Sequence, residues 1–414
     1  MTDAADRPLP TRLLMLGTFA FQPKATMRSR ALGIAAALQR RSWDVLIGTT
    51  PWDNPVDAGR RWVERGVRVT NTRETRPALW PLAVAEMARW GRAERPELIH
   101  VFKPKGFGDL AGRLMRRRTP LVLDMDDWEG NGGWNDVGLY GPLQRRVFDW
   151  QERTLPVRAR AVTVASRELE RRALELGVPA ARVHYVPNGL DDERIADLGA
   201  ARSAAPPGDL DIGPEPRLLL YTRFVEFQPA FVVETLALVR GRVHDARLVI
   251  AGASADGGPE RELDRLAAGA GLGAAISRLG WIAPEALGGI AMSCALAIHP
   301  FDDTRLNRAK CSVKLLELMA TGTAIATTRV GENPRYVEHE RSGLVVAPGD
   351  PSALAAVAVR LLEDPSLRTA LGTSARQRVE KHYRWDVLVE PVLDAYAQAL
   401  GASNGQRGGS LETG

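Results

Sequence analysis

The apolar positions of this chain form short runs that alternate with stretches of helical periodicity. In the first half these runs predict buried strands at 13–17, 44–48, 98–102, 121–125, 161–165 and 183–186. The stretches between them predict helices at 27–41, 79–93, 107–117, 142–154 and 167–176. This alternation is typical of a mostly parallel, doubly wound α/β sheet, whose ligands bind beyond the carboxyl ends of the strands.

The alternation starts again in the second half. Apolar runs predict strands at 218–221, 248–251, 276–279, 296–299, 324–327 and 344–346. Helices are predicted at 231–241, 260–268, 284–292, 312–321, 351–362 and 366–382. The repeat predicts two Rossmann-like domains that face each other across a cleft, an N-terminal one over 1–197 and a C-terminal one over 217–385.

Three segments fall outside the two repeats. The segment 198–216 is rich in Ala, Gly, Pro and Asp, which predicts a linker near a hinge. The segment 386–400 is an amphipathic helix left over after the second sheet is complete, so we expect it to pack back on the first domain. We expect the polar tail 401–414 to be disordered.

Charge stands out on the apolar helix predicted at 312–321. Lys314, Glu317 and Thr321 share one face of it, and Ser312 is a candidate N-cap. In one interpretation the helix start binds a phosphate, while Glu317 accepts hydrogen bonds from a diol such as the ribose of a nucleotide. In the other, Lys314 and Glu317 form an internal ion pair.

Composition limits the classes of protein to consider. The 414 residues are 45% hydrophobic and 25% charged, as in globular proteins. No apolar run approaches the ~20 residues that cross a bilayer, and residues 1–10 lack the apolar core of a signal peptide. The two cysteines, Cys294 and Cys311, supply neither a disulfide framework nor a zinc site, so we expect a cytoplasmic protein.

The charge is distributed unevenly along the chain. The first 200 residues carry 32 Lys and Arg against 25 Asp and Glu, and the rest carry 23 against 25. The basic half suits an anionic partner such as a lipid surface or a phosphorylated acceptor, although its charges are scattered apart from 116–118. Peripheral contact with an anionic membrane at its inner face is one interpretation of this charge. Zinc-finger spacing and basic surfaces interleaved with aromatic residues are both missing from the sequence, which argues against nucleic acid as a partner.

A glycine motif at 106–111 matches the dinucleotide-binding pattern G-x-G-x-x-G/A. It follows a predicted strand, and Asp124, Asp126 and Asp127 come about 20 residues later, where a ribose-binding carboxylate belongs. The motif follows a later strand of the sheet, however, whereas the dinucleotide motif belongs to the first. We therefore expect no nicotinamide or flavin cofactor.

Six ordered segments resemble the family-4 glycosyltransferases, which have the two-domain GT-B architecture. They are Val-Pro-Asn-Gly at 186–189, Tyr-Thr-Arg-Phe at 221–224, Leu-Val-Ile-Ala-Gly at 248–252, Leu-Gly-Trp-Ile at 279–282, Lys-Leu-Leu-Glu-Leu-Met-Ala-Thr-Gly at 314–322, and Val-Gly-Glu at 330–332 followed by Ser-Gly-Leu-Val-Val-Ala-Pro-Gly-Asp at 342–350. The resemblance covers nearly everything from residue 13 to residue 400. It implies a nucleotide-sugar donor held mainly by the second domain and an acceptor held by the first.

The resemblance also implies roles for individual residues. Glu317 would hold the donor ribose, Arg223 would contact the diphosphate, and Ile282 would lie beside the base. The backbone from Ser312 through Val313 to Lys314 would meet phosphate. The full set of candidate donor-binding residues is Arg223, Gln228, Ile282, Asn307, Lys310, Ser312, Val313, Lys314 and Glu317.

The sequence departs from the family pattern at two donor positions. Ala309 replaces a glutamate that contacts the donor sugar, and Gln228, followed by Pro229, replaces a lysine. Lys310 or Lys314 would then supply the missing positive charge. The candidates for contact with the sugar hydroxyls are Asp302, Asp303 and Asn307. These departures keep a non-catalytic sugar-nucleotide-binding protein and a nucleotide-sugar epimerase of the same architecture open as alternatives.

In the first domain, Asp126 and Asp127 end the strand where many relatives have a histidine. They are candidates to orient an acceptor hydroxyl or accept its proton, and in the alternative interpretation they only cap the following loop. Lys24, Thr26, Arg28, Lys103 and Lys105 are candidate acceptor-binding residues at neighbouring strand ends.

The expected activity is transfer of a sugar from a nucleotide-diphosphate sugar to an acceptor hydroxyl, with retention of configuration implied by the resemblance. Arg223 and Lys314 would stabilise the departing diphosphate, and Asp126 and Asp127 complete the catalytic candidates. The acceptor would be a glycan, a glycolipid or a small molecule. We expect no metal, because the acidic cluster at 124–127 lies in the acceptor domain, and no cofactor besides the co-substrate.

Overall fold

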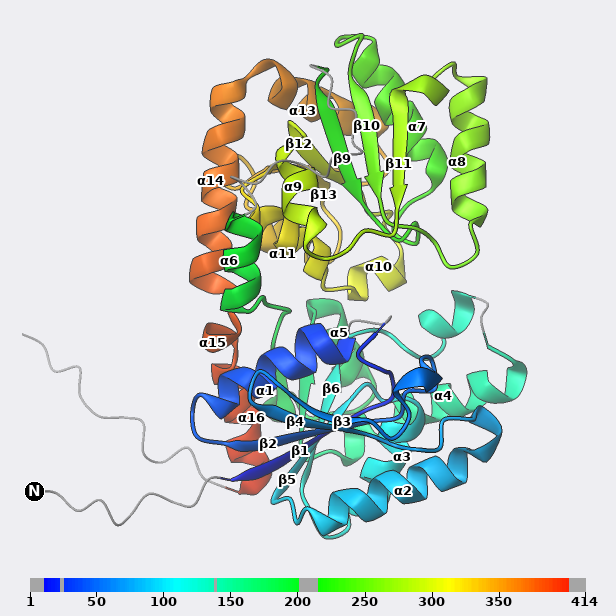
Figure 1. Ribbon diagram of the computed structural model, residues 1–414, viewed down its shortest axis with the longest axis vertical. Coiled ribbons are helices and arrows are strands. Elements are labelled where there is room, and N and C mark those ends of the chain that lie inside the picture. Colours follow the sequence, from blue (N-terminus) through cyan, green and yellow to red (C-terminus); the bar gives the residue numbers. More distant parts are fainter. Residues whose placement is uncertain (1–10, 23–25, 138–139, 201–214, 402–414) are drawn as a thin grey trace, which may run out of the picture. The chain divides into compact units, whose positions relative to one another are not determined.

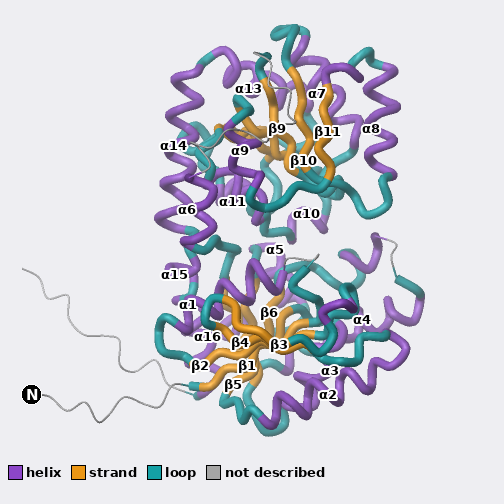
Figure 2. Tube along the Cα trace, in the orientation of Figure 1, coloured by secondary structure: helices purple, strands orange, loops and turns teal. Residues whose placement is uncertain are grey.

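The computed structural model describes residues 11–22, 26–137, 140–200 and 215–401. The chain forms two compact units (Figures 1 and 2). Unit 1 comprises Met1–Pro187 and Trp385–Gly414, and unit 2 comprises Asn188–Arg384. Each is described separately below.

Unit 1 is built on one eight-stranded sheet with the strand order β3-β4-β2-β1-β5-β6-β7-β8. Its strands are β1 (Arg12–Gly17), β2 (Asp44–Thr49), β3 (Arg61–Glu64), β4 (Val67–Asn71), β5 (Leu98–Phe102), β6 (Leu121–Met125), β7 (Ala161–Val164) and β8 (Val183–Tyr185). All neighbouring strands are parallel except the β3–β4 pair, which is antiparallel. Every residue of β5, β6 and β7 is buried, as expected for parallel strands covered on both faces.

Most helices of unit 1 connect these strands in the sequence, and the last two follow unit 2. They are α1 (Leu32–Gln39), preceded by a π-helical turn at Met27–Ala31, α2 (Trp80–Ala93), α3 (Gly106–Met115), α4 (Pro142–Thr154), α5 (Arg167–Glu175), α15 (Trp385–Leu388) and α16 (Glu390–Leu400). The predicted helix at 386–400 corresponds to α15 and α16, and α16 packs against β6, β7 and β8. Gly33 of α1 leaves the space that the Trp385 ring fills, because a Cβ there would meet it.

Unit 2 contains a parallel six-stranded sheet with the order β11-β10-β9-β12-β13-β14. Its strands are β9 (Arg217–Tyr221), β10 (Arg247–Ala251), β11 (Ile276–Gly280), β12 (Leu296–His299), β13 (Ala324–Thr328) and β14 (Leu344–Val346). Its helices are α6 (Asp192–Ala200), α7 (Pro229–Arg240), α8 (Gly258–Gly269), α9 (Ala286–Met292), α10 (Arg305–Ala309), α11 (Val313–Ala320), α12 (Asn333–Tyr336), α13 (Pro351–Glu363) and α14 (Pro365–His382). The two mostly parallel α/β sheets confirm the predicted fold class.

The chain changes unit earlier than the composition predicts. The predicted linker 198–216 begins inside α6, which belongs to unit 2 together with everything from Asn188 onward. The reason is burial, since Ile195 and Leu198 of α6 are almost fully covered where that helix packs on α9 and α11. Residues 201–214 of the predicted linker and 402–414 of the predicted tail lie outside the described residues.

Candidate active site

The loop after β9 carries a buried carboxylate among the candidate donor-binding residues of unit 2. Glu226 is buried, and its carboxylate accepts hydrogen bonds from the Thr222 hydroxyl at 3.0 Å and the Val225 backbone N–H at 3.2 Å. Its Oε1 lies 3.3 Å from Nζ of Lys310 and 3.9 Å from Nζ of Lys314. Burial raises the pKa of Glu226, but the two lysines and the hydrogen bonds outweigh it and leave the pKa well below normal.

The start of α11 brings Lys314 to this carboxylate. Ser312 is the N-cap, as the sequence predicts, and its hydroxyl accepts a hydrogen bond from the Leu315 backbone N–H at 3.3 Å. Burial, together with the positive charges of Lys310 and Arg223, lowers the pKa of Lys314 to about 8 against the opposing effect of Glu226. A bound anion would therefore stabilise the ammonium of Lys314. The N-terminus of α11 also favours anions, because its partial charge is positive.

Glu317, one turn further along α11, has a different partner from the one its spacing predicts. Arg194 of α6 donates to Oε1 of Glu317 from Nε at 2.8 Å and from Nη2 at 2.5 Å. The internal pair of Lys314 with Glu317 is therefore replaced by two separate pairs, Lys314 with Glu226 and Glu317 with Arg194. Sequence spacing could not reveal either pair, because the partners are far apart in the chain.

The other candidate donor residues lie around this cluster. Asn307 is buried, and its amide donates to the backbone carbonyls of Glu226 and Asp302, so it holds the loop after β9 in place. The backbone N–H of Gln228 donates to Asp302. Ile282 is half-buried. Its neighbour Trp281 is 64% exposed, with the Arg223 guanidinium 5.7 Å from its ring centre.

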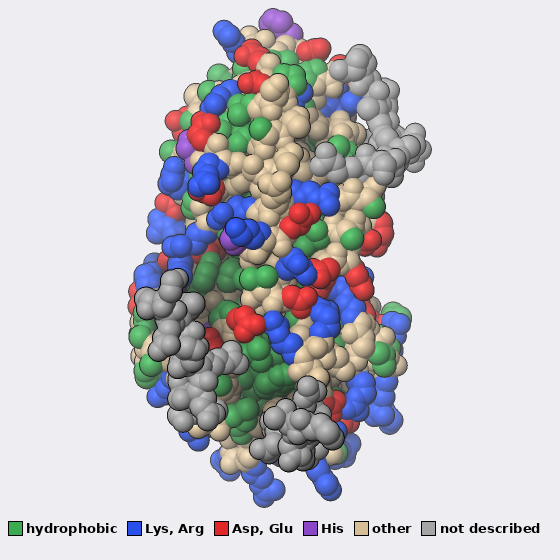
Figure 3. Space-filling view, turned by 90° about the vertical axis from the view of Figure 1, so that its left-hand side faces the viewer, with side chains coloured by type: hydrophobic (Ala, Val, Ile, Leu, Met, Phe, Trp, Pro, Cys, Tyr) green, Lys and Arg blue, Asp and Glu red, His purple; other side chains and the backbone are tan. Residues whose placement is uncertain are grey.

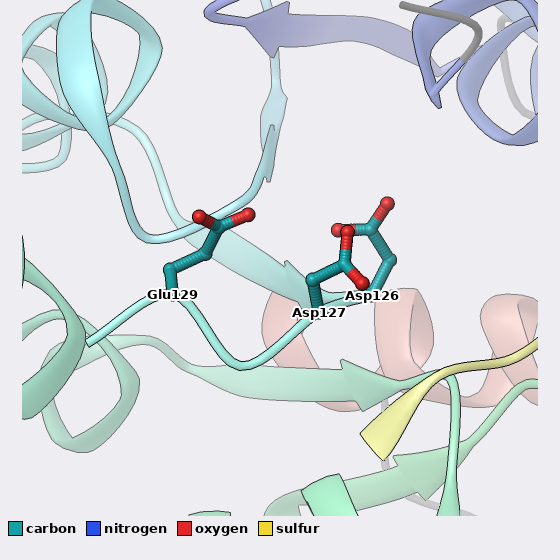
Figure 4. Close-up of side chains that lie close together, drawn as sticks. All are labelled: Asp126, Asp127 and Glu129. Atoms are coloured by element: carbon teal, nitrogen blue, oxygen red, sulfur yellow. The ribbon is translucent and has the colours of Figure 1, made fainter. Parts of the chain in front are cut away.

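A second charged cluster lies at the carboxyl ends of β5 and β6 in unit 1. Asp126, Asp127 and Glu129 follow β6 within one short stretch, and their carboxylate oxygens lie within 4.8 Å of one another (Figure 4). Nζ of Lys103 lies among them, 3.2 Å from Asp126, 2.5 Å from Asp127 and 2.8 Å from Glu129. The ammonium of Lys103 therefore lies within ion-pair distance of all three carboxylates.

Lys105 adds a second ammonium to this cluster. Its Nζ lies 2.6 Å from Glu129 and 3.1 Å from the Tyr140 hydroxyl. Burial disfavours both ammonium groups, but the carboxylates outweigh it and raise the pKa of Lys103 and of Lys105. Both candidate acceptor-binding lysines thus serve as partners of buried carboxylates.

Asp126 is the least compensated member of the cluster. Its Oδ1 lies 3.2 Å from Lys103 yet accepts no hydrogen bond from the part of the chain that the structure describes. Burial raises the pKa of Asp126 to about 7, with help from Asp127 and Asp124 and against the opposing pull of Lys103. A carboxyl group that titrates near neutral pH is suited to proton transfer.

The remaining acceptor candidates and the glycine motif have other surroundings. Lys24 lies outside the described residues. Thr26 is half-buried and opens the π-helical turn, and Arg28 lies 3.7 Å from Glu64 of β3.

In the glycine motif, Gly106 has φ +64°, and a Cβ on Gly108 would approach the backbone of Gly17 to 3.0 Å. The motif therefore allows the start of α3 to pack closely on the end of β1.

Sequence reasoning missed three members of these clusters, namely Glu129, Arg194 and Glu226. Glu129 and Glu226 have a weak signal, since each is a carboxylate a few residues after a buried strand, and Glu226 stands between apolar residues. Arg194 has none, because it stands among charged residues at the start of an ordinary surface-like helix.

Two family models match the chain. The "Glycosyl transferase 4-like domain" model matches residues 25–189, and the "Glycosyl transferases group 1" model matches residues 215–364. The chain belongs to the family-4 glycosyltransferases and has their GT-B architecture.

Individual relatives agree with this assignment. A GDP-mannose-dependent alpha-(1-6)-phosphatidylinositol monomannoside mannosyltransferase of Mycobacterium tuberculosis is 28% identical over 271 residues, which cover 63% of this chain and 66% of the relative. An alpha-maltose-1-phosphate synthase of the same organism is 27% identical over 297 residues, covering 69% of this chain and 76% of the relative. The chain therefore spans about two thirds of the length of the mannosyltransferase it matches.

Solved structures show the same fold. A sucrose-phosphate synthase from Thermosynechococcus elongatus superposes with a TM-score of 0.70 at 21% identity, covering 95% of this chain and 100% of that one. The Anabaena protein HepE, solved in complex with UDP, gives a TM-score of 0.67 at 18% identity, covering 94% of this chain and 100% of that one.

The surface and the helices bear on the expected membrane contact. No helix among the described residues is long and apolar enough to cross a membrane. Lys and Arg side chains are intermixed with Asp and Glu over the face shown in Figure 3. No single basic patch stands out among the coloured side chains of that face.

Proposed function

We propose that this glycosyltransferase moves a sugar from a nucleoside-diphosphate sugar to an acceptor hydroxyl, with retention of configuration. The observation that carries the proposal is Lys314, a largely buried lysine at a helix N-terminus whose pKa is lowered to about 8 beside Arg223 and Lys310. Such a group is stabilised when a diphosphate binds next to it. Retention rests on the family resemblance.

Each cluster has a task in the proposed reaction. The bond between the sugar and the diphosphate oxygen breaks, and Lys314, Arg223 and the start of α11 stabilise the negative charge that develops on the leaving diphosphate. A new bond forms between the same sugar carbon and the acceptor oxygen. The proton of that hydroxyl passes to Asp126, whose pKa of about 7 suits a general base. Glu317 binds the donor ribose through its carboxylate.

The comparisons suggest which substrates to try. Relatives are named as GDP-mannose-dependent, and the HepE structure contains UDP, so both bases belong in a donor screen. The mannosyltransferase is named for a phosphatidylinositol acceptor, which supports a glycolipid acceptor and contact with an anionic membrane for this chain. Glycans and small polyols complete the acceptor panel.

The test is acceptor-dependent release of nucleoside diphosphate. Purified protein is first screened for thermal stabilisation by UDP- and GDP-sugars, since a ligand at ~100 times its dissociation constant adds ~2.7 kcal/mol to stability. The stabilising donor is then incubated with each acceptor, and the diphosphate and the glycosylated product are measured. We expect both products only when donor and acceptor are present together. Absence of stabilisation by every donor would contradict the proposal.

Two residues favour a non-catalytic sugar-nucleotide-binding protein as the second candidate. Ala309 is fully buried where the family pattern has a donor-contacting glutamate, and Gln228 uses its backbone N–H to hold Asp302 where the pattern has a lysine. This candidate predicts donor binding without release of diphosphate under any acceptor. The same experiment therefore separates the two functions.

A further inference from the structure

Arg194 connects three parts of the donor region in unit 2. It lies in the first turn of α6, soon after the chain enters this unit. Besides its two hydrogen bonds to Oε1 of Glu317, it donates from Nη1 to the backbone carbonyl of Pro284 at 2.9 Å. Pro284 follows the segment that carries Trp281 and Ile282. One guanidinium thus links α6, α11 and the loop after β11.

The helix that presents Arg194 is itself held in place. Ile195 and Leu198 are buried where α6 packs on α9 and α11. At its start, Asp192 accepts two hydrogen bonds from Arg384, at 2.6 and 2.8 Å. At its end, a Cβ on Gly199 would lie 2.5 Å from the Arg376 guanidinium, so α6 and α14 approach closely there. Arg194 is therefore presented from a fixed helix.

Only one of the two carboxylate oxygens of Glu317 accepts hydrogen bonds from the described residues. Both hydrogen bonds from Arg194 go to Oε1, whereas Oε2 accepts none from the described residues. The side chains of Arg194 and Glu317 are only 15% and 12% exposed, so water competes weakly for the pair. The carboxylate is held in one orientation with its second oxygen still available. A purely structural pair would gain more from bidentate pairing, in which both oxygens accept.

We propose that Arg194 is a positioning residue for recognition of the donor ribose. It fixes the rotamer of Glu317 so that Oε2 meets the ribose hydroxyls, and it ties that carboxylate to the segment beside the expected base. This inference rests on the proposed function, in which Glu317 binds the ribose. Preorganisation of this kind improves binding because the carboxylate does not have to be ordered when the ligand arrives.

The test measures discrimination between ribose and deoxyribose. Full-length protein is titrated calorimetrically with UDP and GDP, and the nucleotide that binds is compared with its 2′-deoxy counterpart. We expect wild-type protein to prefer the ribonucleotide about tenfold or more, the effect of one hydrogen bond to a charged group. Arg194→Met should reduce that preference to below about threefold. Arg194→Lys, which keeps the charge but not the paired donors, should fall between them.

Controls separate positioning from a merely structural role. Arg265→Met removes an exposed ion pair with Glu262 on α8 of the same unit and should keep the full preference for ribose. Melting curves of each variant show whether it folds, and Arg194→Lys carries the test if Arg194→Met does not. An unchanged ribose preference in the folded Arg194 variants would overturn the inference while leaving the proposed function intact. Failure of wild-type protein to bind any nucleotide would overturn the proposed function as well.

Discussion

Two buried lysines, one in each unit, have opposite electrostatic surroundings. Lys103 in unit 1 contacts the carboxylates of Asp126, Asp127 and Glu129, and they raise its pKa well above normal. Lys314 in unit 2 lies 3.9 Å from the carboxylate of Glu226, near Lys310 and Arg223, and its pKa falls to about 8. Burial disfavours the ammonium in both places, so the difference comes from the neighbouring charges.

The difference indicates what each cluster can bind. In unit 1 three carboxylates face the two ammonium groups of Lys103 and Lys105, and Asp126 responds with a pKa of about 7. That cluster can take up a proton at neutral pH. In unit 2 the environment of Lys314 disfavours a positive charge, so an incoming anion stabilises it. The first pattern suits a base for an acceptor hydroxyl, and the second suits a diphosphate.

The largest expected effect is the loss of activity when Asp126, the proposed proton acceptor in unit 1, is replaced. Asp126→Asn should lower kcat/KM about 10²- to 10⁴-fold, the usual contribution of a general base. In the wild type, the rate should rise with pH up to about 7 and then level off, because only the deprotonated carboxylate accepts a proton. The variant should lose that dependence. Steady-state rates of diphosphate release from pH 5.5 to 8.5 measure both effects.

A matched control uses a carboxylate at the opposite edge of the same sheet. Asp44 begins β2 and pairs with Arg12 at 2.6 Å, away from the carboxyl ends of the strands. Asp44→Asn should keep the wild-type pH profile. Activity of Asp126→Asn within about threefold of wild type would show that another group accepts the proton.

The next effect is on stability. Lys103→Met removes the ammonium shared by three carboxylates and should lower the unfolding free energy of unit 1 by about 3–5 kcal/mol. Methionine meets the same backbone strain as lysine at φ +69°, so the loss reports the charge. Of the ten tryptophans only Trp281 belongs to unit 2, so tryptophan fluorescence during urea unfolding follows unit 1 almost alone.

An exposed ion pair in the same unit provides the control for stability. Arg153 pairs with Asp149 on α4, and its side chain is 59% exposed. Arg153→Met should change the unfolding free energy by less than about 1 kcal/mol. A loss of similar size in the two variants would mean that Lys103 contributes no more than a surface charge.

Much of the fold was predictable because a buried parallel strand has a short, continuous apolar sequence that can be recognised locally. β5, β6 and β14 have the predicted bounds, and Ser312 caps α11 as expected. The β3–β4 hairpin was not predicted, because exposed and half-buried residues alternate along β3 and leave no apolar run. α6 was not predicted, and its last residues, 198–200, fall in a segment whose composition resembles a linker, although Ile195 and Leu198 are buried.

The sequence identified individual charged residues of the candidate site, but it did not reveal which residues form ion pairs with them. The charged face of α11 identified Lys314 and Glu317 from their positions alone. Their partners, Glu226 and Arg194, lie 88 and 123 residues earlier in the sequence, where no periodic pattern connects them. The same holds for Lys103, whose carboxylates follow the next strand of the sheet. A single sequence shows where a charge is costly to bury, whereas the fold decides which group compensates it.

The smallest predicted effect is a pH dependence of donor binding set by Lys314. A bound diphosphate stabilises the ammonium and raises its pKa above the value of about 8 in the free protein. Below pH 8 the lysine is already charged, so the affinity for nucleoside diphosphate should be constant once the phosphate itself is ionised, near pH 6. Above pH 8 binding must take up a proton. The affinity should therefore fall with rising pH, approaching tenfold, or about 1.4 kcal/mol, per pH unit.

Calorimetric titrations with UDP or GDP at pH 7, 8 and 9 measure this slope, and two lysine variants locate its source. Lys314→Met should bind more weakly at pH 7 and lose the slope, because no ammonium remains to be deprotonated at this position. Lys381→Met, on α14 at the far end of the sequence of unit 2, should keep the wild-type slope. A slope that persists in Lys314→Met would assign the titrating group elsewhere, and the contrast between the two buried lysines would then not extend to ligand binding.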